Sequence, residues 1–488
     1  MTQTWNTSEP VTPEVRTYAA VTGVVLLLLM FFGVLLRMTQ GQWLGIGPDL
    51  FYQIMTAHGI GMVAIVTLGG MAVIWHFMGR YLALHRAAAI ANLVLFLVGV
   101  VMVLASIFLG GYAAAWTMLY PLSSHSLQVW SDLAASGYLV GVLLVGVGML
   151  VFYLEIARAI ATQYEGGFKA ALGWKRLRTG NKEDAPPPPI IAGAVCTIGN
   201  LVGTLFGAVI LVMMLIHVFL PQFAFSALLA KNFIFLFGHV VINVAIYMAV
   251  VAVYEILPRY TGRPWGVYPA FILAWNATLL MVLTVYPHHL LMDFAMPDWM
   301  AFWGQIISYA SALPVFAVTL VGTLANVHRS GMRWDLASGL LVLSIFGWSA
   351  GIVPAVLDGT IAINQVMHNT QWVPGHFHTY LLLGVVPMLL AFMTWIGNQG
   401  RAGQFGAVRG GTFWLYAVAG LGFTMAFLFA GSAGVPRRYA VHLAQWVGYD
   451  RVASVFALLV LLAAALIILP AVVRIATRGR TVAAAAAR

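Results

Sequence analysis

Cysteine is almost absent from this chain, since Cys196 is the only one among 488 residues. A single thiol excludes an intrachain disulfide, and it excludes a copper or iron–sulfur centre built on several thiolates. Cys196 lies in an apolar run, where we interpret it as a packing residue. A metal site in this chain must therefore use other side chains.

Charge is also scarce, because only 8% of the residues are charged while 62% are hydrophobic. A water-soluble protein of this length would have a larger share of charged residues, so we expect this chain to lie in a lipid bilayer. The sequence predicts an all-α membrane protein with about twelve transmembrane helices and a single integral-membrane domain over residues 1–488. The apolar runs lie at 17–36, 51–77, 86–112, 132–160, 190–219, 230–257, 266–292, 300–325, 336–357, 373–397, 411–431 and 453–477.

The net charge of +10 would suggest nucleic acid as the partner of a soluble protein. Here the basic residues fall in short loops on alternate sides of the apolar runs, as the positive-inside rule describes. We therefore expect membrane lipid and no nucleic acid as a partner, with both termini in the cytoplasm. The stretch 161–189, which ends in four prolines, is the expected cytoplasmic linker loop. No removable signal peptide is expected.

Six histidines lie within the apolar runs at a similar predicted depth near the outer face. They are His58 in the second run, His239 in the sixth, His288 and His289 in the seventh, and His376 and His378 in the tenth. A single intramembrane histidine is more often a hydrogen-bonded structural residue, but six in one layer favour ligation of iron or copper by neutral imidazole.

Spacing adds to this prediction. His376 and His378 are two residues apart, so on a helix they point about 200° apart and one helix can hold two haems. His288 and His289 follow Pro287 near a helix end and point about 100° apart. Together with His239 they could form a three-nitrogen site with an open position, which suits a reactive copper.

These motifs resemble subunit I of the haem-copper oxidase superfamily, such as cytochrome c oxidase subunit I, and are closest to its B-type branch. The resemblance covers nearly the whole chain. In order, the motifs are Tyr52-Gln53 with Thr56-Ala57-His58-Gly59, Gly238-His239, Pro287-His288-His289, the stretch HNTQWVPGHFH at 368–378, and Val435-Pro436-Arg437-Arg438.

The resemblance implies a role for each matching residue. His58 and His378 would be the axial ligands of a low-spin haem, expected to be b-type. His376 would bind the iron of a high-spin haem, facing one copper ion held by His239, His288 and His289. Arg437 and Arg438 would bind haem propionates through charge-assisted hydrogen bonds. His368, one turn after Asn364, would lie near the propionates of the high-spin haem, and a merely structural role for it stays open.

The same resemblance implies a catalytic subunit of a respiratory terminal reductase in the cytoplasmic membrane of a bacterium or archaeon. Electrons would pass from an outer cytochrome c-type or cupredoxin donor through the low-spin haem to the haem-copper centre, which reduces a diatomic gas. Because this chain has no cysteine-rich soluble domain, we expect at least one further subunit with an outer copper or c-type haem centre.

The chain departs from the family pattern at Asn243, where oxygen reductases of this branch usually carry a tyrosine. Asparagine cannot form a phenoxyl radical. Another branch places its substitute tyrosine in the seventh span, but Val282 stands there. Tyr247, one turn below Asn243, is the nearby alternative.

The expected proton route also lacks several of the hydroxyl groups that could relay protons. Positions that carry hydroxyl groups in B-type oxidases read Val250, Val315 and Val318, with Tyr254 and Thr319 remaining nearby. Both departures favour reduction of NO to N2O over reduction of O2 to water, the alternative, as in the nitric oxide reductases that arose within oxidase-like branches. Against this, no intramembrane glutamate lies near the predicted copper ligands.

The alternative from a different functional class is a membrane transporter with a histidine proton relay. Such a transporter predicts inverted repeats around a site at the membrane midplane. The histidines here gather near one face instead, and this favours the reductase.

Overall fold

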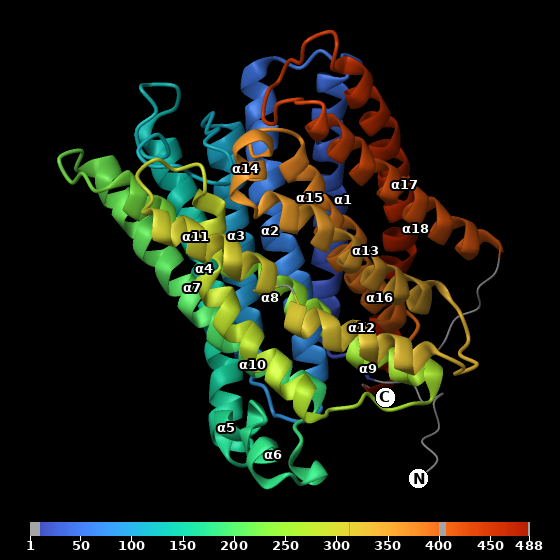
Figure 1. Ribbon diagram of the computed structural model, residues 1–488. Helices are drawn as coiled ribbons and strands as arrows, with labels where there is room; N and C mark the ends of the chain where they lie inside the picture. The colour runs from blue at the N-terminus through green and yellow to red at the C-terminus, as the bar shows by residue number, and fades with distance from the viewer. Residues whose placement is uncertain (1–9, 312, 400–406, 487–488) are drawn as a thin grey trace.

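The structure is a computed structural model that describes residues 10–311, 313–399 and 407–486, and this part of the chain is a bundle of helices (Figure 1). The elements are α1 (Pro13–Gln40), α2 (Pro48–Met78), α3 (Arg86–Phe108), α4 (Asp132–Gln163), α5 (Gly167–Ala171), α6 (Trp174–Thr179), η1 (Lys182–Asp184), α7 (Pro188–Phe219), α8 (Ala227–Ala249), α9 (Val251–Thr261), α10 (Pro269–Thr284), η2 (Tyr286–Leu290), α11 (Asp298–Ser311), α12 (Leu313–Val327), α13 (Leu336–Asp358), α14 (Ile361–Met367), α15 (Trp372–Tyr380), η3 (Leu381–Val385), α16 (Val386–Gly397), α17 (Ala407–Ser432) and α18 (Val447–Ala486).

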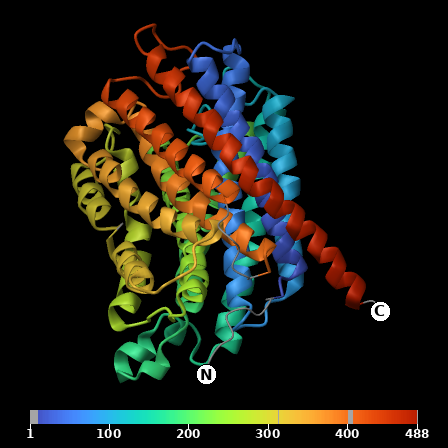
Figure 2. The same cartoon turned by 90° about the vertical axis from the view of Figure 1, so that its right-hand side faces the viewer.

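Twelve helical spans within the described residues are long and apolar enough to cross a membrane, one for each predicted apolar run. Several extend beyond those runs, and α4 and α7 each have 32 residues. About 20 residues already span the hydrocarbon, so the additional turns reach into the headgroup layer or accommodate tilt. Figures 1 and 2 show the helices inclined to one another.

The sixth, seventh, eighth and tenth spans each consist of more than one helical segment. In the tenth, a π-helical turn, η3, lies between α15 and α16. Pro387 in the first turn of α16 has no N–H to donate to the carbonyl of Leu383, and the wider turn accommodates that missing bond. The histidines of this span therefore lie on a short helix just above an irregular turn.

Three of the four spans that carry the predicted ligand histidines occupy the middle of the bundle, and the fourth, which carries His288 and His289, is 44% buried. In the most apolar stretch of each span, 78% of the residues are buried in α2, 72% in α8–α9 and 94% in α15–α16, whereas the other spans range from 18% to 56%. Side chains on these central helices face protein rather than lipid. The fold therefore provides a protein interior in which several polar side chains can meet.

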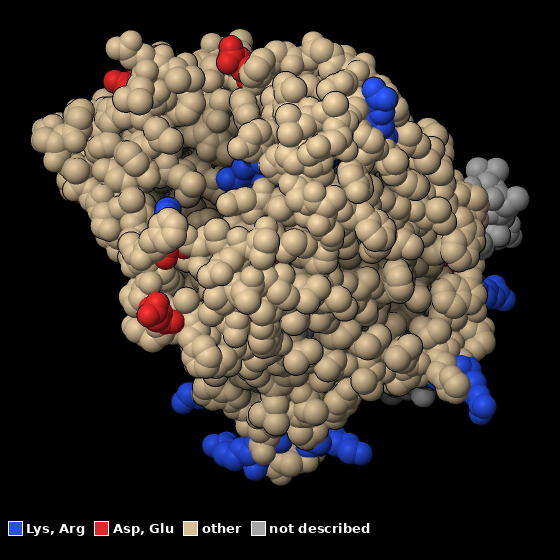
Figure 3. Space-filling view, turned by 45° about the horizontal axis from the view of Figure 1, so that its top comes forward, with Lys and Arg blue, Asp and Glu red and all other residues tan. Residues whose placement is uncertain are grey.

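Most of the basic residues gather at one end of the bundle, which is the lower end in Figure 3. The first described helix begins at this end, and α18 runs back toward it (Figure 2). This arrangement agrees with the predicted positive-inside orientation. The opposite, outer end is hollowed in Figure 3, and basic side chains lie in the hollow.

The predicted linker 161–189 contains α5, α6 and η1 rather than a continuous extended chain. It is fixed to the bundle at Asn276 of α10, whose side-chain amide donates to the Leu172 carbonyl over 2.9 Å. The Asn276 side-chain oxygen accepts a hydrogen bond of 2.9 Å from the Trp174 indole. The lower end of α10 is thus covered by folded chain.

Candidate functional site

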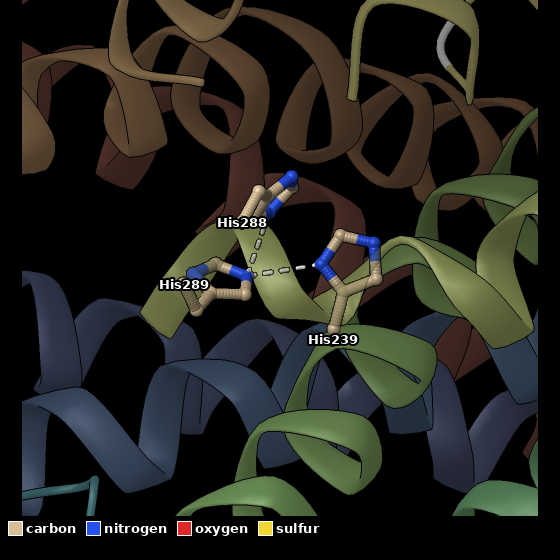
Figure 4. A group of neighbouring side chains, drawn as sticks. All are labelled: His239, His288 and His289. Carbon is tan, nitrogen blue, oxygen red and sulfur yellow. Dashed lines mark hydrogen bonds between the residues drawn. The ribbon is translucent and has the colours of Figure 1, made fainter. Parts of the chain in front are cut away.

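Three imidazoles converge where α8 meets η2. His239 projects from α8, and His288 and His289 project from η2, with one ring nitrogen of each within 4.8 Å of the others (Figure 4). The Nδ1 of His239 and the Nε2 of His288 each lie 3.0 Å from the Nε2 of His289. Three converging nitrogen donors could hold one metal ion with a further position open.

Neighbouring groups orient two of these rings. The Ser308 hydroxyl on α11 lies 3.0 Å from the Nδ1 of His288, which leaves the Nε2 of that ring facing the cluster. Gly304 allows this approach, because a Cβ there would lie 2.8 Å from the backbone nitrogen of His288. Such outer contacts fix the ring orientation of metal-binding histidines.

Asn243 lies one helical turn below His239 on α8. Its side-chain nitrogen is 3.0 Å from the Nε2 of His239 and donates over 2.9 Å to the His239 backbone carbonyl. The carboxamide therefore contacts the face of His239 that points away from the cluster. No redox-active side chain occupies this position.

His58 of α2 and His378 of α15 face one another as a nearly parallel pair. Their ring centroids are 6.4 Å apart and their planes differ by 14°. The Nδ1 of His58 is held by the Leu29 carbonyl at 2.8 Å, and the Nδ1 of His378 by the Pro374 carbonyl at 2.7 Å. Both Nε2 atoms are thereby left available for a ligand between the rings.

The distance between the two rings can be compared with that expected for two imidazoles bound to one metal ion. A histidine nitrogen binds a first-row metal at about 2 Å, and its ring centroid lies about 1.2 Å further away, so two axial imidazoles have centroids about 6.4 Å apart. The His58–His378 separation equals this value. The separation of the two rings therefore suits one metal ion held between them.

His376 lies on the other side of α15, two residues before His378. Its Nδ1 is buried and makes no well-formed hydrogen bond within the described part of the chain, although the Gly351 carbonyl is close enough to interact with the ring. Tyr380, one turn further along, packs edge-on against it with centroids 5.3 Å apart. As the spacing predicted, one helix presents imidazoles in two directions.

All of these groups line one cavity of about 510 Å³. Its walls include the residues predicted from the sequence, namely His58, His239, Asn243, His288, His289, His368, His376, His378, Arg437 and Arg438. This volume lies within the range of about 300–1,000 Å³ for ligand sites. The structure therefore brings every predicted site residue to a single interior space.

Arg437 and Arg438 line the outer end of the cavity and lie on a segment, residues 435–442, that we call the strap. The strap is joined to the start of α15 by a hydrogen bond of 2.8 Å from the Gln371 backbone N–H to the Val435 carbonyl. Arg438 adopts a left-handed backbone conformation with φ of 68°, which is rare outside glycine. Contacts on both sides of the strap must hold this conformation in place.

A buried ion cluster holds the other side of the strap. Asp450 of α18 accepts from Arg37 of α1 at 3.2 Å and pairs with the Nδ1 of His442 at 2.6 Å. The Nε2 of His442 lies 3.1 Å from the Pro436 carbonyl. Arg37 in turn lies over the ring of Phe427, which stacks on His378. The position of the two strap arginines is thus linked to that of His378.

The strap makes the outer end of the cavity strongly positive. Burial and the neighbouring Arg438 lower the pKa of Arg437 to about 10, while Asp358 opposes this shift. Burial and the charges of both arginines lower the pKa of His368 to about 4, so this histidine is neutral at neutral pH. An anionic ligand would be favoured here, and the carboxylates of a haem have the required charge.

Ser308, Tyr380 and Asp358 are among the groups that line the cavity and that sequence reasoning missed. Tyr380 could have been found from its spacing of four residues after His376, which places both on the same helix face. No sequence pattern indicated that Asp358 lies in the site, because Asp358 is the last residue of α13 and reaches the cavity only through the packing of that helix.

Comparison with known proteins agrees with this geometry. A sequence profile of the family described as cytochrome c and quinol oxidase polypeptide I matches residues 14–466. The haem-copper oxidase subunit I+III of Aeropyrum pernix is 26% identical over 451 residues, covering 88% of this chain and 52% of that protein. The cytochrome c oxidase polypeptide 1 of Halobacterium salinarum is 24% identical over 433 residues, covering 85% of this chain and 69% of that one. The chain thus spans about half the length of the first relative.

A solved structure shows the same fold. It is a cryo-EM structure of a haem-copper terminal oxidase dimer, with a TM-score of 0.73 at 18% identity, covering 95% of this chain and 84% of that one. The matched profile extends over almost all of the described helices. This chain therefore belongs to the cytochrome c and quinol oxidase polypeptide I family and is an integral membrane protein of the haem-copper oxidase superfamily.

Proposed function

We propose that this chain is the catalytic subunit of a respiratory terminal reductase that reduces a diatomic gas, with NO as the preferred substrate and N2O as the product. The observation that carries the proposal is the meeting of two histidine groups in one cavity: the convergent His239, His288 and His289, and the parallel pair His58 and His378.

The donor sets suit two haems and one copper ion. The parallel pair would hold a low-spin haem, b-type on the family resemblance, and His376 would hold a second, high-spin haem. The three convergent imidazoles would hold copper. When bound, these groups supply electrons to the gas and polarise it.

The other residues bind, orient and exclude water. Arg437 and Arg438 would pair with haem carboxylates, and neutral His368 would offer a hydrogen-bond partner beside them. Ser308 and Asn243 hold the rings of His288 and His239 in their orientation. The apolar lining, which includes Ile242, Ile246 and Trp348, keeps the interior low in polarity.

Asn243 supports NO over O2. Cleaving O2 to water takes four electrons, and a nearby phenol is a convenient additional source. Coupling two NO molecules takes only two electrons. The Asn243 carboxamide lies 3.0 Å from the Nε2 of His239 and cannot be oxidised. This position therefore supplies no electron in addition to those that the metals would supply.

Reduction of O2 is the second candidate, and two observations favour it. The Halobacterium relative is named a cytochrome c oxidase polypeptide. In addition, Tyr247 and Tyr380 both line the cavity, and either phenol could replace the one that is missing at Asn243.

Parallel turnover assays on the purified complex test the proposal. The complex is supplied with a reduced cytochrome c-type donor, and consumption of NO and of O2 is followed with electrodes in separate runs. We expect NO to be consumed faster, with N2O as the product. Oxygen consumption exceeding NO consumption would reverse the preference, and no consumption of either gas would reject the reductase.

The electron donor requires a partner. We propose at least one additional subunit with an outer copper or c-type haem centre, which receives electrons from a cytochrome c-type or cupredoxin donor. If this chain, purified alone with its metals, accepted electrons from a soluble cytochrome at the full rate of the complex, that proposal would fail. Residues 1–488 would form one catalytic domain within such a complex.

A further inference from the structure

Asp358 is the only carboxylic acid among the described residues that line the cavity. It is the last residue of α13, at the outer end of the bundle, directly before the exposed helix α14 (Figure 1). Among the described residues it forms no ion pair within 4.0 Å, whereas Asp450 and Asp293 at the same end are both paired. A carboxyl group in a low-polarity site without a paired cation is able to change its protonation state during a reaction.

The groups around Asp358 come from three elements. Asn364 of α14 donates its side-chain N–H to the Asp358 backbone carbonyl at 2.6 Å and to the Oδ1 of Asp358 at 3.3 Å. The Arg437 guanidinium on the strap interacts with the carboxyl group electrostatically without contacting it. His368, also near Asn364, stays neutral because its pKa is lowered to about 4 by burial and by the two arginines.

The chain directly after Asp358 packs against a residue that orients the convergent imidazoles. Gly359, the next residue, packs so closely against Ser308 that a Cβ there would lie 2.5 Å from the Ser308 hydroxyl. That hydroxyl lies 3.0 Å from the Nδ1 of His288. On the other side, the Oδ1 of Asn364 is buried without a hydrogen-bond partner among the described groups, as expected where a water molecule completes a network.

We propose that Asp358 is the acid that delivers protons from the outer aqueous phase to the gas reduced at this site. The inference rests on the proposed reductase function and adds the proton source that the sequence did not show. Two NO molecules, two electrons from the reduced donor and two protons give one N2O and one water. One N–N bond and two O–H bonds form and one N–O bond breaks, and Asp358 gives one proton in each of two successive transfers to the oxygen that leaves as water. The carboxylate is then reprotonated from the outer side through the polar groups beside α14.

Three variants of the whole complex test this assignment. Asp358→Asn keeps the shape and removes the acid, and Asp358→Glu keeps the acid. Asp293→Asn is the matched control, because Asp293 is an outer carboxylate that pairs with Lys231 at 2.6 Å and does not line the cavity. Iron and copper contents are measured first in each variant.

We expect Asp358→Asn to lower NO turnover about 100-fold, which is within the usual contribution of a positioned acid. Asp358→Glu should retain most of the turnover, and Asp293→Asn should match the unmodified complex. Infrared difference spectra between oxidised and reduced complex should contain a carboxyl band that only Asp358→Asn removes. In vesicles with the outer face exposed, a pH indicator outside should show proton uptake with each turnover.

Normal turnover and an unchanged carboxyl band in Asp358→Asn would overturn the assignment while leaving the reductase function intact. Should Asp358→Asn lose its metals, the infrared spectrum of Asp358→Glu decides, since a carboxyl band unshifted from the unmodified complex would also overturn it. Failure of the unmodified complex to consume either gas would reject the proposed function instead.

Discussion

A methyl group added at Gly33 is expected to displace His58. Gly33 lies on α1, and a Cβ there would be 2.9 Å from the Cε1 of His58 and 3.4 Å from its Nδ1. Because Gly33 has no side chain, the Leu29 carbonyl one turn earlier is free to accept from the Nδ1 of His58 at 2.8 Å. Carbon atoms pack at about 3.5–4.0 Å, so Gly33→Ala requires the ring to move by about 0.6–1.1 Å.

A shift of that size weakens the hydrogen bond to Leu29 and tilts the ring away from His378. Losing one such bond costs about 0.5–1.5 kcal/mol, which is roughly a 2- to 12-fold change in the equilibrium between the positioned and the displaced ring. If His58 is an axial ligand, Gly33→Ala should convert part of the low-spin haem to a high-spin form. Optical and electron paramagnetic resonance spectra of the oxidised complex measure that fraction.

Gly411→Ala on α17 is the matched control, because no atom of the described residues lies within 4 Å of the added Cβ. It should leave the spectra unchanged. A Gly33→Ala complex with the full low-spin signal and an unchanged midpoint potential would refute the assignment of His58 as an axial ligand in this position.

Three further predictions follow from the site. His289→Ala should remove copper and keep both haems, so that elemental analysis of the complex gives a copper-to-iron ratio falling from about 1:2 to near zero; retention of copper would contradict the three-histidine site. Gly304→Val should displace the backbone of His288, which a Cβ at residue 304 would approach to 2.8 Å, and should also lower the copper content; an unchanged copper content would show that α11 does not support the site. Because burial and two arginines lower the pKa of His368 from 6.5 to about 4, the unfolded chain binds a proton that the folded chain does not over that range, so stability falls as the pH falls through it, by at most about 3 kcal/mol. Thermal unfolding of the chain without its haems, whose carboxylates would oppose this pKa shift, should therefore show a smaller loss between pH 6.5 and 4 in His368→Asn. Equal losses in both proteins would contradict the neutral state of His368.

The sequence by itself determined the number and order of the membrane spans and the layer in which the histidines lie. Hydrocarbon requires long apolar helices, so the apolar runs along the sequence located the twelve spans. The bias of basic loops then oriented each span and gave every histidine a depth. The spacing of His376 and His378 also predicted their opposite directions, because helical periodicity is a local property.

Only the tertiary structure decided which of these histidines meet. The 14° angle between His58 and His378 depends on where the bundle places α2 and α15 and on two backbone carbonyls, and neither is encoded in a local pattern. The same holds for Asp358, because a residue at the end of one helix reaches a cavity only through the placement of its neighbours. Local sequence determines where polar groups lie along a helix, and long-range packing determines which of them share an interior.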